Sequence, residues 1–269
     1  MKKLLNLAAI TFMACGAWVF PAAAQTFNQN INIPEASAIT SLNDGSFLVV
    51  DDEEGVYHLN QKLEAKMLLS SSEFSFLDEL EGICLSVDQK TVYLLSEDGG
   101  RIIKTQLQQS KDGMKLSRPE VLGSLASIGN TRNKGYEGIT TIILNGKEHL
   151  LAVHQENPTA LAIFSLPELN KITMCKIPDE ISELLDNLSD VTIDHRNGHL
   201  LLLSGKSGRI VELKAQIDKD IEELEVVSSI KIKGRLNGKP EGICFDSEEK
   251  MVVVTDGGGD PSDFIRFEK

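Results

Sequence analysis

The sequence predicts an all-β protein, a β-propeller of about five four-stranded blades. The first observation is a short phrase that recurs five times. Its copies are Ser37-Ala38-Ile39, Glu81-Gly82-Ile83, Glu137-Gly138-Ile139, Ser189-Asp190-Val191 and Glu241-Gly242-Ile243. The copies lie 44, 56, 52 and 52 residues apart, and periods of this size are typical of solenoids, propellers and arrays. The second observation is that every copy opens the same series of apolar runs and polar turns, which is the pattern of an antiparallel blade.

Each repeat begins with an inner strand at the phrase and continues with a strongly apolar second strand. The second strands are expected at residues 47–50, 92–95, 150–153, 200–203 and 251–254. Short apolar runs bounded by Gly, Asp and Asn indicate strands that are buried on both faces. Polar turns such as Asn145-Gly146 and Asn197-Gly198 separate the first two strands, and these residue pairs favour tight hairpins.

Two further strands complete each repeat. Third strands are expected at residues 56–59, 101–107, 160–166, 209–213 and 264–267. Fourth strands are expected at residues 65–69, 115–121, 171–177 and 226–232. An immunoglobulin-like array would need units of about 100 residues, and a β-helix would show much shorter repeats, so neither fits.

The last repeat stops after its third strand. The alternating segment 27–33 precedes the first phrase, and we expect it to supply the missing outer strand and close the ring. Closure removes an open sheet edge, which gives it a physical motive. Five repeats predict five blades, with a degenerate sixth blade as the alternative. Residues 179–187 are expected to form a short helix between blades, with Asp179 as its cap.

Residues 1–24 have the pattern of a cleaved secretion signal, followed by one propeller domain over residues 25–269. Lys2 and Lys3 precede an apolar stretch, and Ala22-Ala23-Ala24 forms an A-x-A cleavage site before Gln25. This pattern predicts a periplasmic or secreted protein. The alternative is an uncleaved membrane anchor, although the stretch of about 17 residues is at the lower limit for spanning a bilayer. No later segment is long enough to cross a membrane.

Charge and cysteine content exclude several classes of protein. The net charge is −13, and removal of Lys2 and Lys3 brings it to about −15. Such a balance argues against nucleic acid and anionic lipid as partners. It is compatible with cation binding, although solubility accounts for most of it. Cys84, Cys175 and Cys244 remain after cleavage, and an odd number cannot form a complete disulfide framework.

The propeller topology predicts an acidic mouth to the central channel. An inner strand starts on the face of the disc where the second strand ends, so Glu81, Glu137 and Glu241 are expected together at this mouth. Other candidates on the same face follow the second strands or border the phrases; they are Asp52, Glu97, His154, Glu156, Asn157, Ser189, Asp256 and, from the loop 124–135, Lys134. Carboxylates that face one axis repel each other unless they take up protons or bind a cation.

Calcium is the natural candidate for that cation, since it accepts six to eight oxygen ligands in flexible geometry. Glu81, Glu137 and Glu241 are the predicted ligands. One alternative is that each Glu caps backbone amides at a blade junction, as a repeated packing device. Another is a catalytic pair of carboxylates. His154 is a candidate base or ligand, or simply a hydrogen-bonded core residue.

Several segments, in this order, resemble the SdiA-regulated family, also called YjiK-like, of bacterial envelope β-propellers. They are Asn133-Lys134-Gly135-Tyr136-Glu137-Gly138, Glu156-Asn157-Pro158, Leu188-Ser189-Asp190, residues 199–204 and Pro240-Glu241-Gly242-Ile243. The resemblance implies a propeller with a calcium ion as candidate ligand, and an export signal or membrane anchor. It implies no particular activity. The chain departs from the family at Gly205-Lys206-Ser207 and at Thr255-Asp256-Gly257-Gly258.

Three functional hypotheses follow. The first is an exported protein that binds an unknown small molecule or envelope protein at its acidic mouth. The second is a calcium-dependent hydrolase, like the lactonase and phytase-like esterase propellers that this chain distantly resembles. In such an enzyme the metal would polarise the substrate and a Glu or His154 would activate water. The third is an envelope scaffold without a small-molecule site.

Overall fold

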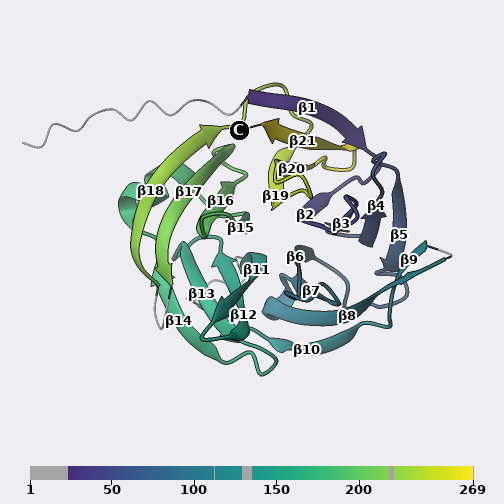
Figure 1. Cartoon of the computed structure of the whole chain (residues 1–269), viewed down its shortest axis with the longest axis horizontal. Helices are drawn as coiled ribbons and strands as arrows, with labels where there is room; N and C mark the ends of the chain where they lie inside the picture. The colour runs from purple at the N-terminus through teal and green to yellow at the C-terminus, as the bar shows by residue number, and fades with distance from the viewer. Residues whose placement is uncertain (1–23, 112, 129–134, 218–220, 269) are drawn as a thin grey trace, which may run out of the picture.

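Five antiparallel sheets surround a central axis, as expected (Figure 1); four of them have four strands, and the second carries one additional strand. The computed structural model describes residues 24–111, 113–128, 135–217 and 221–268. The proposed signal segment lies almost wholly outside the described residues, as does Lys134. Among the described residues, no helix combines the length and the apolar character that crossing a bilayer requires.

The sheets are the five predicted blades, and each follows the chain from the axis outward. The first two contain β2 (Ala36–Ser41), β3 (Phe47–Asp51), β4 (Gly55–Leu59) and β5 (Ala65–Ser70), then β6 (Leu80–Leu85), β7 (Thr91–Ser96), β8 (Arg101–Ser110) and β10 (Glu120–Ser124). The third and fourth contain β11 (Tyr136–Leu144), β12 (Lys147–His154), β13 (Ala160–Ser165) and β14 (Lys171–Lys176), then β15 (Asp190–Asp194), β16 (His199–Ser204), β17 (Arg209–Ile217) and β18 (Ile221–Lys231). The fifth contains β19 (Lys239–Phe245), β20 (Met251–Asp256), β21 (Ser262–Glu268) and β1 (Ala24–Ile31).

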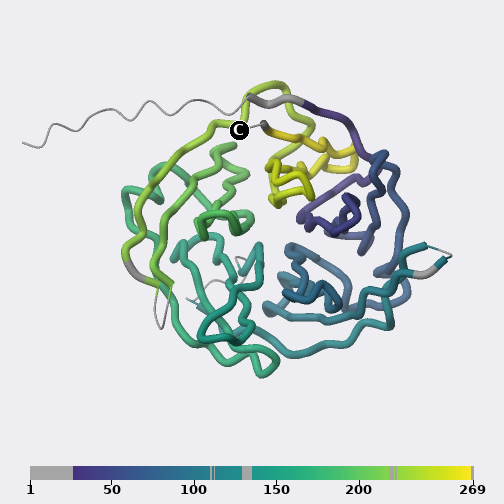
Figure 2. Tube along the Cα trace, in the orientation of Figure 1, coloured from purple at the N-terminus to yellow at the C-terminus, as the bar shows by residue number. Residues whose placement is uncertain are grey.

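The N-terminal strand closes the ring, which confirms the prediction. Strand β1 pairs antiparallel with β21, in a register that sets Ile31 opposite Ser262. Figure 2 shows the purple start of the described chain lying along its yellow end. Ile31 is 1% exposed, and Phe27 contacts the ring of Phe264 edge-on at 6.4 Å. The first and last segments of the propeller therefore share one sheet, and the described residues contain five blades rather than six.

Five apolar clusters hold the propeller together, one between each pair of neighbouring blades. Strand β16 shows how this works: Leu200 and Leu202 join the cluster with the third blade, whereas Leu201 and Leu203 join the cluster with the fifth. Successive side chains of a strand point to opposite faces of its sheet. Because both faces are covered, every position from Leu200 to Leu203 is apolar. This packing explains the continuous apolar runs in the sequence.

Two local predictions were wrong in detail. A single fourth strand was expected at residues 115–121, but two strands occur there, β9 (Gly113–Leu116) and β10. Strand β8 has ten residues. Residues 107–110 pair with β9 in a hairpin, and residues 101–104 pair with β10. Helix α1 (Asp179–Leu185) is present, but Pro178 is its N-cap and no side chain caps it. Asp179 lies inside the first turn instead, where its charge favours the helix dipole.

Candidate functional site

The three predicted glutamates share one backbone feature. The pairing of β6 with β7 skips a residue between Leu80 and Gly82, and the same irregularity occurs at the start of β11 and of β19. The skipped residues are Glu81, Glu137 and Glu241. A bulge of this type leaves one residue out of the ladder and re-aims its side chain. The repeated phrase therefore encodes a repeated bulge that presents a carboxylate at the start of each of these inner strands.

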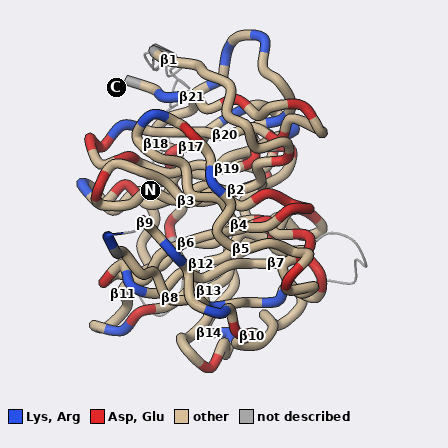
Figure 3. Tube along the Cα trace, turned by 90° about the vertical axis from the view of Figure 1, so that its right-hand side faces the viewer, with Lys and Arg blue, Asp and Glu red and all other residues tan. Residues whose placement is uncertain are grey.

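These carboxylates interact, although they come from different blades. Burial raises the pKa of Glu81 well above its usual value, and the charges of Glu137, Asp52 and Glu241 raise it further, in that order. Glu137 is 7% exposed. Glu81 therefore shares one electrostatic environment with carboxylates from three other blades. Figure 3 shows the propeller from its side, with Asp and Glu in red along the loops at the right-hand edge, beside β4 and β7.

Asp52 is held next to this group by the backbone. Its carbonyl accepts a 3.3 Å hydrogen bond from the N–H of Leu80, the residue before Glu81. Burial raises the pKa of Asp52 to about 6, with further contributions from the charges of Glu35 and Glu79. A carboxyl group with this pKa exchanges its proton near neutral pH, whereas an ordinary Asp is fully ionised there.

Glu97 and Asp256 also lie at this end of the inner strands, directly after β7 and at the end of β20. Burial raises the pKa of Glu97, and a hydrogen bond from the Gly135 backbone opposes the shift. Asp256 pairs with Glu35 in an isolated bridge, and its carboxylate accepts a 2.7 Å hydrogen bond from the N–H of Gly258.

Glu241 and Ser189 form a tight junction between the fourth and fifth blades. Burial raises the pKa of Glu241, and a hydrogen bond from Ser189 lowers it. The Ser189 hydroxyl accepts a 3.1 Å hydrogen bond from the N–H of Gly205. A Cβ atom at Gly205 would lie 2.9 Å from Glu241 Oε1 and 2.7 Å from the Pro240 carbonyl. The departure from the family pattern at Gly205 therefore provides room for this contact.

Two other candidates have different surroundings. His154 is only 2% exposed; its Nδ1 lies 2.8 Å from the Pro158 carbonyl and its ring contacts Tyr136 edge-on at 5.4 Å. Burial lowers its pKa, so His154 is a neutral, hydrogen-bonded residue beneath the mouth. Asn157 is exposed and Glu156 is partly buried in the loop that follows β12.

Calcium fits the chemistry of these donors but not their present arrangement. Glu81, Glu137, Glu241 and Asp52 supply hard carboxylate oxygens, which calcium prefers. Within the residues that the structure describes, however, no three Asp, Glu, His or Cys side chains are close enough together to hold a metal ion. Glu137, Asp52 and Glu241 are near enough to raise the pKa of Glu81 without forming a group that could hold a metal ion.

Asp190 is a polar residue whose role the sequence did not reveal. It occupies the phrase position that is Gly or Ala in the other repeats, and it is 3% exposed. Its carboxylate accepts hydrogen bonds from the N–H groups of Val191 (2.7 Å) and Ile243 (2.8 Å). Gly138 packs directly against it, since a Cβ there would lie 2.3 Å from Asp190 Oδ1. The sequence feature that could have indicated this role is the acidic residue at a phrase position that is otherwise Gly or Ala.

The fold and the site together define the class of this protein as a five-bladed β-propeller with neighbouring carboxylates at one end of its central channel. The chain belongs to the SdiA-regulated family, whose model matches residues 32–268. None of the curated protein sequences matches it.

Two solved structures have a similar fold. The glutaminyl cyclase of Myxococcus xanthus is 12% identical, with a TM-score of 0.58 over 92% of this chain and 98% of that one. A chain of a nidogen/laminin complex is 13% identical, with a TM-score of 0.53 over 82% of this chain and 73% of that one. At these identities the likeness concerns the fold alone.

Proposed function

We propose that this protein is an exported envelope propeller that binds a calcium ion at its acidic mouth and presents that mouth to a small molecule or an envelope protein. The observation that carries the proposal is that burial, together with the charges of Glu137, Asp52 and Glu241, disfavours the anionic form of Glu81. A bound cation would remove this repulsion, because an opposite charge favours the ionised form of each carboxyl group.

Calcium suits this mouth better than other cations. It tolerates irregular geometry and a mixture of carboxylate, hydroxyl and carbonyl oxygens, whereas magnesium requires a nearly ideal octahedron. Glu81, Glu137 and Glu241 are the proposed ligands, and Ser189 contributes an adjacent hydroxyl. Binding would require these three side chains to move toward one another, since no three Asp, Glu, His or Cys side chains of the described residues are close enough together to hold a metal ion.

Thermal unfolding with and without calcium tests the proposal. We expect 1 mM calcium to raise the unfolding temperature of the wild type, because a ligand that binds only the folded state stabilises it. In Glu137→Gln, most of this increase should be lost. Glu225→Gln is the matched control, since Glu225 is exposed on the outer strand β18, and it should respond like the wild type. If calcium leaves the wild-type temperature unchanged, the metal site is wrong.

The stability of Glu137→Gln in EDTA, compared with that of the wild type, tests the repulsion between the carboxylates. Glu137→Gln removes one charge from the repelling group, so without metal it should be more stable than the wild type. A variant that is destabilised both with and without calcium would instead point to a packing role for Glu137 at the blade junction.

Export is supported by the pattern of residues 1–24. The predicted cleavage leaves Gln25 as the first residue of the mature protein. Cell fractionation with mass measurement of the mature chain tests this step. A chain that keeps its first residues and sediments with membranes would favour the anchored alternative.

The second candidate is a calcium-dependent hydrolase of lactones or phosphoesters. Asp52 favours it, because a pKa of about 6 is suitable for a group that accepts and returns a proton at neutral pH. Hydrolysis of a chromogenic lactone or phosphomonoester should then need calcium and should fall at least a hundredfold in Asp52→Asn. The scaffold hypothesis predicts a different result. Neither substrate is hydrolysed, and an envelope protein that binds the wild type also binds Glu137→Gln.

A further inference from the structure

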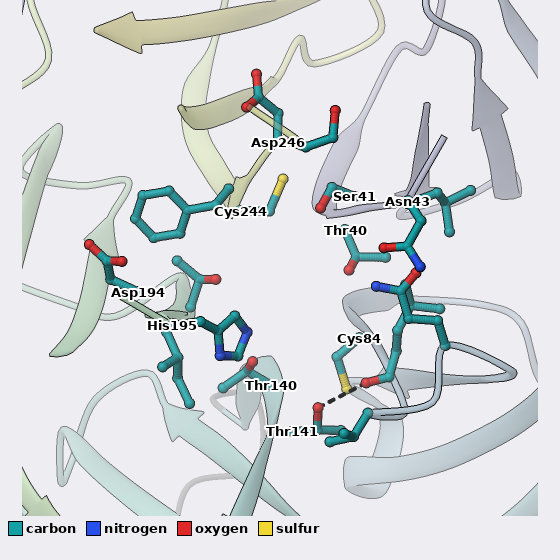
Figure 4. Close-up of a pocket in the computed structure, with 18 of the residues that line it drawn as sticks. Thr40, Ser41, Asn43, Cys84, Thr140, Thr141, Asp194, His195, Cys244 and Asp246 are labelled. Atoms are coloured by element: carbon teal, nitrogen blue, oxygen red, sulfur yellow. Dashed lines mark hydrogen bonds between the residues drawn. The ribbon is translucent and has the colours of Figure 1, made fainter. Parts of the chain in front are cut away.

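The central channel opens into a cavity of about 470 Å³ at the end opposite the acidic mouth (Figure 4). The residues that line it come from all five inner strands and, in four of the blades, from the turns that follow these strands. None of the sequence candidates for the site lies there. This cavity and the acidic mouth are therefore separate features at the two ends of one channel.

One ring of small polar side chains surrounds the cavity. Each repeat contributes the residue immediately after its phrase; these residues are Thr40, Cys84, Thr140, Thr192 and Cys244. In Figure 4, Thr40, Thr140 and both thiols border the same opening. Because the five blades are equivalent, a single repeat position is sufficient to build the whole ring.

The threonine hydroxyls of this ring are available for a ligand. In the described part of the chain, no hydrogen bond within the protein engages the hydroxyl of Thr40, Thr140 or Thr192. The next residue along β11 behaves differently: the Thr141 hydroxyl donates a 2.8 Å hydrogen bond to the Leu85 carbonyl, drawn as the dashed line in Figure 4. Thr141 therefore ties two blades together, whereas the ring threonines offer donors and acceptors to the cavity.

The charged side chains around this cavity are paired with groups of opposite charge. Asp194 is 2% exposed and holds Arg196 through two hydrogen bonds, of 2.6 and 2.7 Å. Arg196 also lies 3.5 Å from a Glu249 oxygen, and Asp246 lies 3.0 Å from Arg266 Nε. An incoming anion would find Arg196 already bound to carboxylates. An uncharged ligand would meet no unfavourable charge.

We propose that this cavity binds an uncharged polyhydroxylated molecule, a sugar or polyol, through the hydroxyl ring of Thr40, Thr140 and Thr192. The volume lies within the range of small-molecule sites, about 300 to 1,000 Å³. Ile193 and Phe245 supply apolar wall for the carbon skeleton, and Asn43 adds an amide at the rim. A vicinal diol can both donate to and accept from a threonine hydroxyl, so it matches this lining.

Calorimetric titration tests the proposal with six neutral probes: glucose, galactose, N-acetylglucosamine, maltose, myo-inositol and glycerol. Glucuronate serves as the anionic counterpart of glucose. We expect at least one neutral probe to bind with a dissociation constant below about 10 mM, and glucuronate to bind more weakly than glucose. If no neutral probe binds, or if glucuronate binds as well as glucose, the proposal fails.

Substitutions locate the binding in the cavity. Thr140→Val and Thr192→Val keep the side-chain volume and remove the hydroxyl, so each should weaken binding about three- to tenfold. Thr173→Val is the control, because Thr173 lies on the outer strand β14 and is not among the residues that line the cavity. Unchanged affinity in both ring variants would exclude the ring. Circular dichroism melting confirms that the variants fold.

The cysteines provide an internal second measurement. Cys84 and Cys244 line the cavity, whereas Cys175 lies on the outer strand β14. A saturating neutral probe should slow N-ethylmaleimide labelling of Cys84 and Cys244, resolved by peptide mass spectrometry, and leave Cys175 unaffected. If the probe leaves the labelling rates of Cys84 and Cys244 unchanged, binding in this cavity is contradicted. Glu137→Gln should retain this protection, so a failure of the calcium proposal would be distinguishable.

Discussion

The Asp190 carboxylate of the fourth blade accepts a 2.8 Å hydrogen bond from the backbone N–H of Ile243 in the fifth blade. Both groups are buried, and the bond joins two inner strands that belong to different sheets. In the other repeats the equivalent position is Gly or Ala, which lets adjacent inner strands approach; a Cβ at Gly242, for example, would lie 2.7 Å from the Ala38 Cα. At this phrase position the junction between the fourth and fifth blades is therefore bonded through a side chain, whereas Gly242 and Ala38 approach backbone to backbone at the next junction.

Replacing Asp190 should destabilise the propeller. In Asp190→Ala the N–H of Ile243 loses its buried partner, and such a loss costs about 1–3 kcal/mol. Asp190→Asn keeps one acceptor oxygen, so its free energy of unfolding should lie between those of Asp190→Ala and the wild type. Urea unfolding measures the free energy of each. Asp78→Ala, at an exposed position, is the control, and an Asp190→Ala protein as stable as this control would show that the bond contributes nothing.

Stability without metal should decrease as the pH rises from about 4 to about 6. Burial and the neighbouring charges of Glu35 and Glu79 raise the pKa of Asp52 to about 6, whereas in the unfolded chain it is near 4. Between these values the folded state binds more protons than the unfolded state, so a higher pH favours unfolding. The contribution of Asp52 to stability is complete below pH 4 and lost above pH 6.

Asp52→Asn should flatten this pH dependence. The measurement is the urea midpoint at intervals from pH 4 to 7 in EDTA, compared between Asp52→Asn and the exposed-site variant Asp78→Asn. The control should keep the wild-type slope. Identical slopes for both variants would mean that Asp52 titrates normally in the folded protein.

Ring closure should depend on the apolar anchor of the N-terminal strand. Ile31 is 1% exposed in the cluster between the fifth and first blades, and truncation of a buried Ile typically costs 2–5 kcal/mol. Ile31→Ala should therefore lower the unfolding free energy by about that amount. Ile172→Ala, at a position that is 47% exposed on β14, should change it by less than about 0.5 kcal/mol. Equal effects of the two variants would show that β1 adds little to closure.

The blade order could be predicted from the sequence because its cause is local. Runs such as residues 200–203 must be apolar at every position when both sheet faces are covered, and Asn-Gly turns mark the hairpins between them. The positions of Glu81, Glu137 and Glu241 followed from the repeat period, since equivalent residues of equivalent blades lie at the same height. The closing strand followed from the missing outer strand of the last repeat.

Other features depend on contacts between blades, which the sequence does not record. His154 follows an apolar run on the predicted face, yet the Pro158 carbonyl and the Tyr136 ring cover it. Asp190 reads as a variant of the phrase, and only its approach to Ile243 makes it a bond between sheets. The ring of Thr and Cys side chains could not be predicted from the sequence. Single Thr and Cys residues are common in strands, and only the packing of five inner strands brings these five together.

The sequence by itself determined the class of fold and the number of repeats, and it predicted the end of the channel where acidic residues collect. The tertiary structure decided which of those carboxylates lie close enough to shift each other's pKa, which polar groups are covered, and where the channel leaves room for a ligand. Strand and turn formation depends on neighbours within a few residues. Burial and electrostatic coupling depend instead on residues about 50 positions away, and only the closed ring brings these side by side.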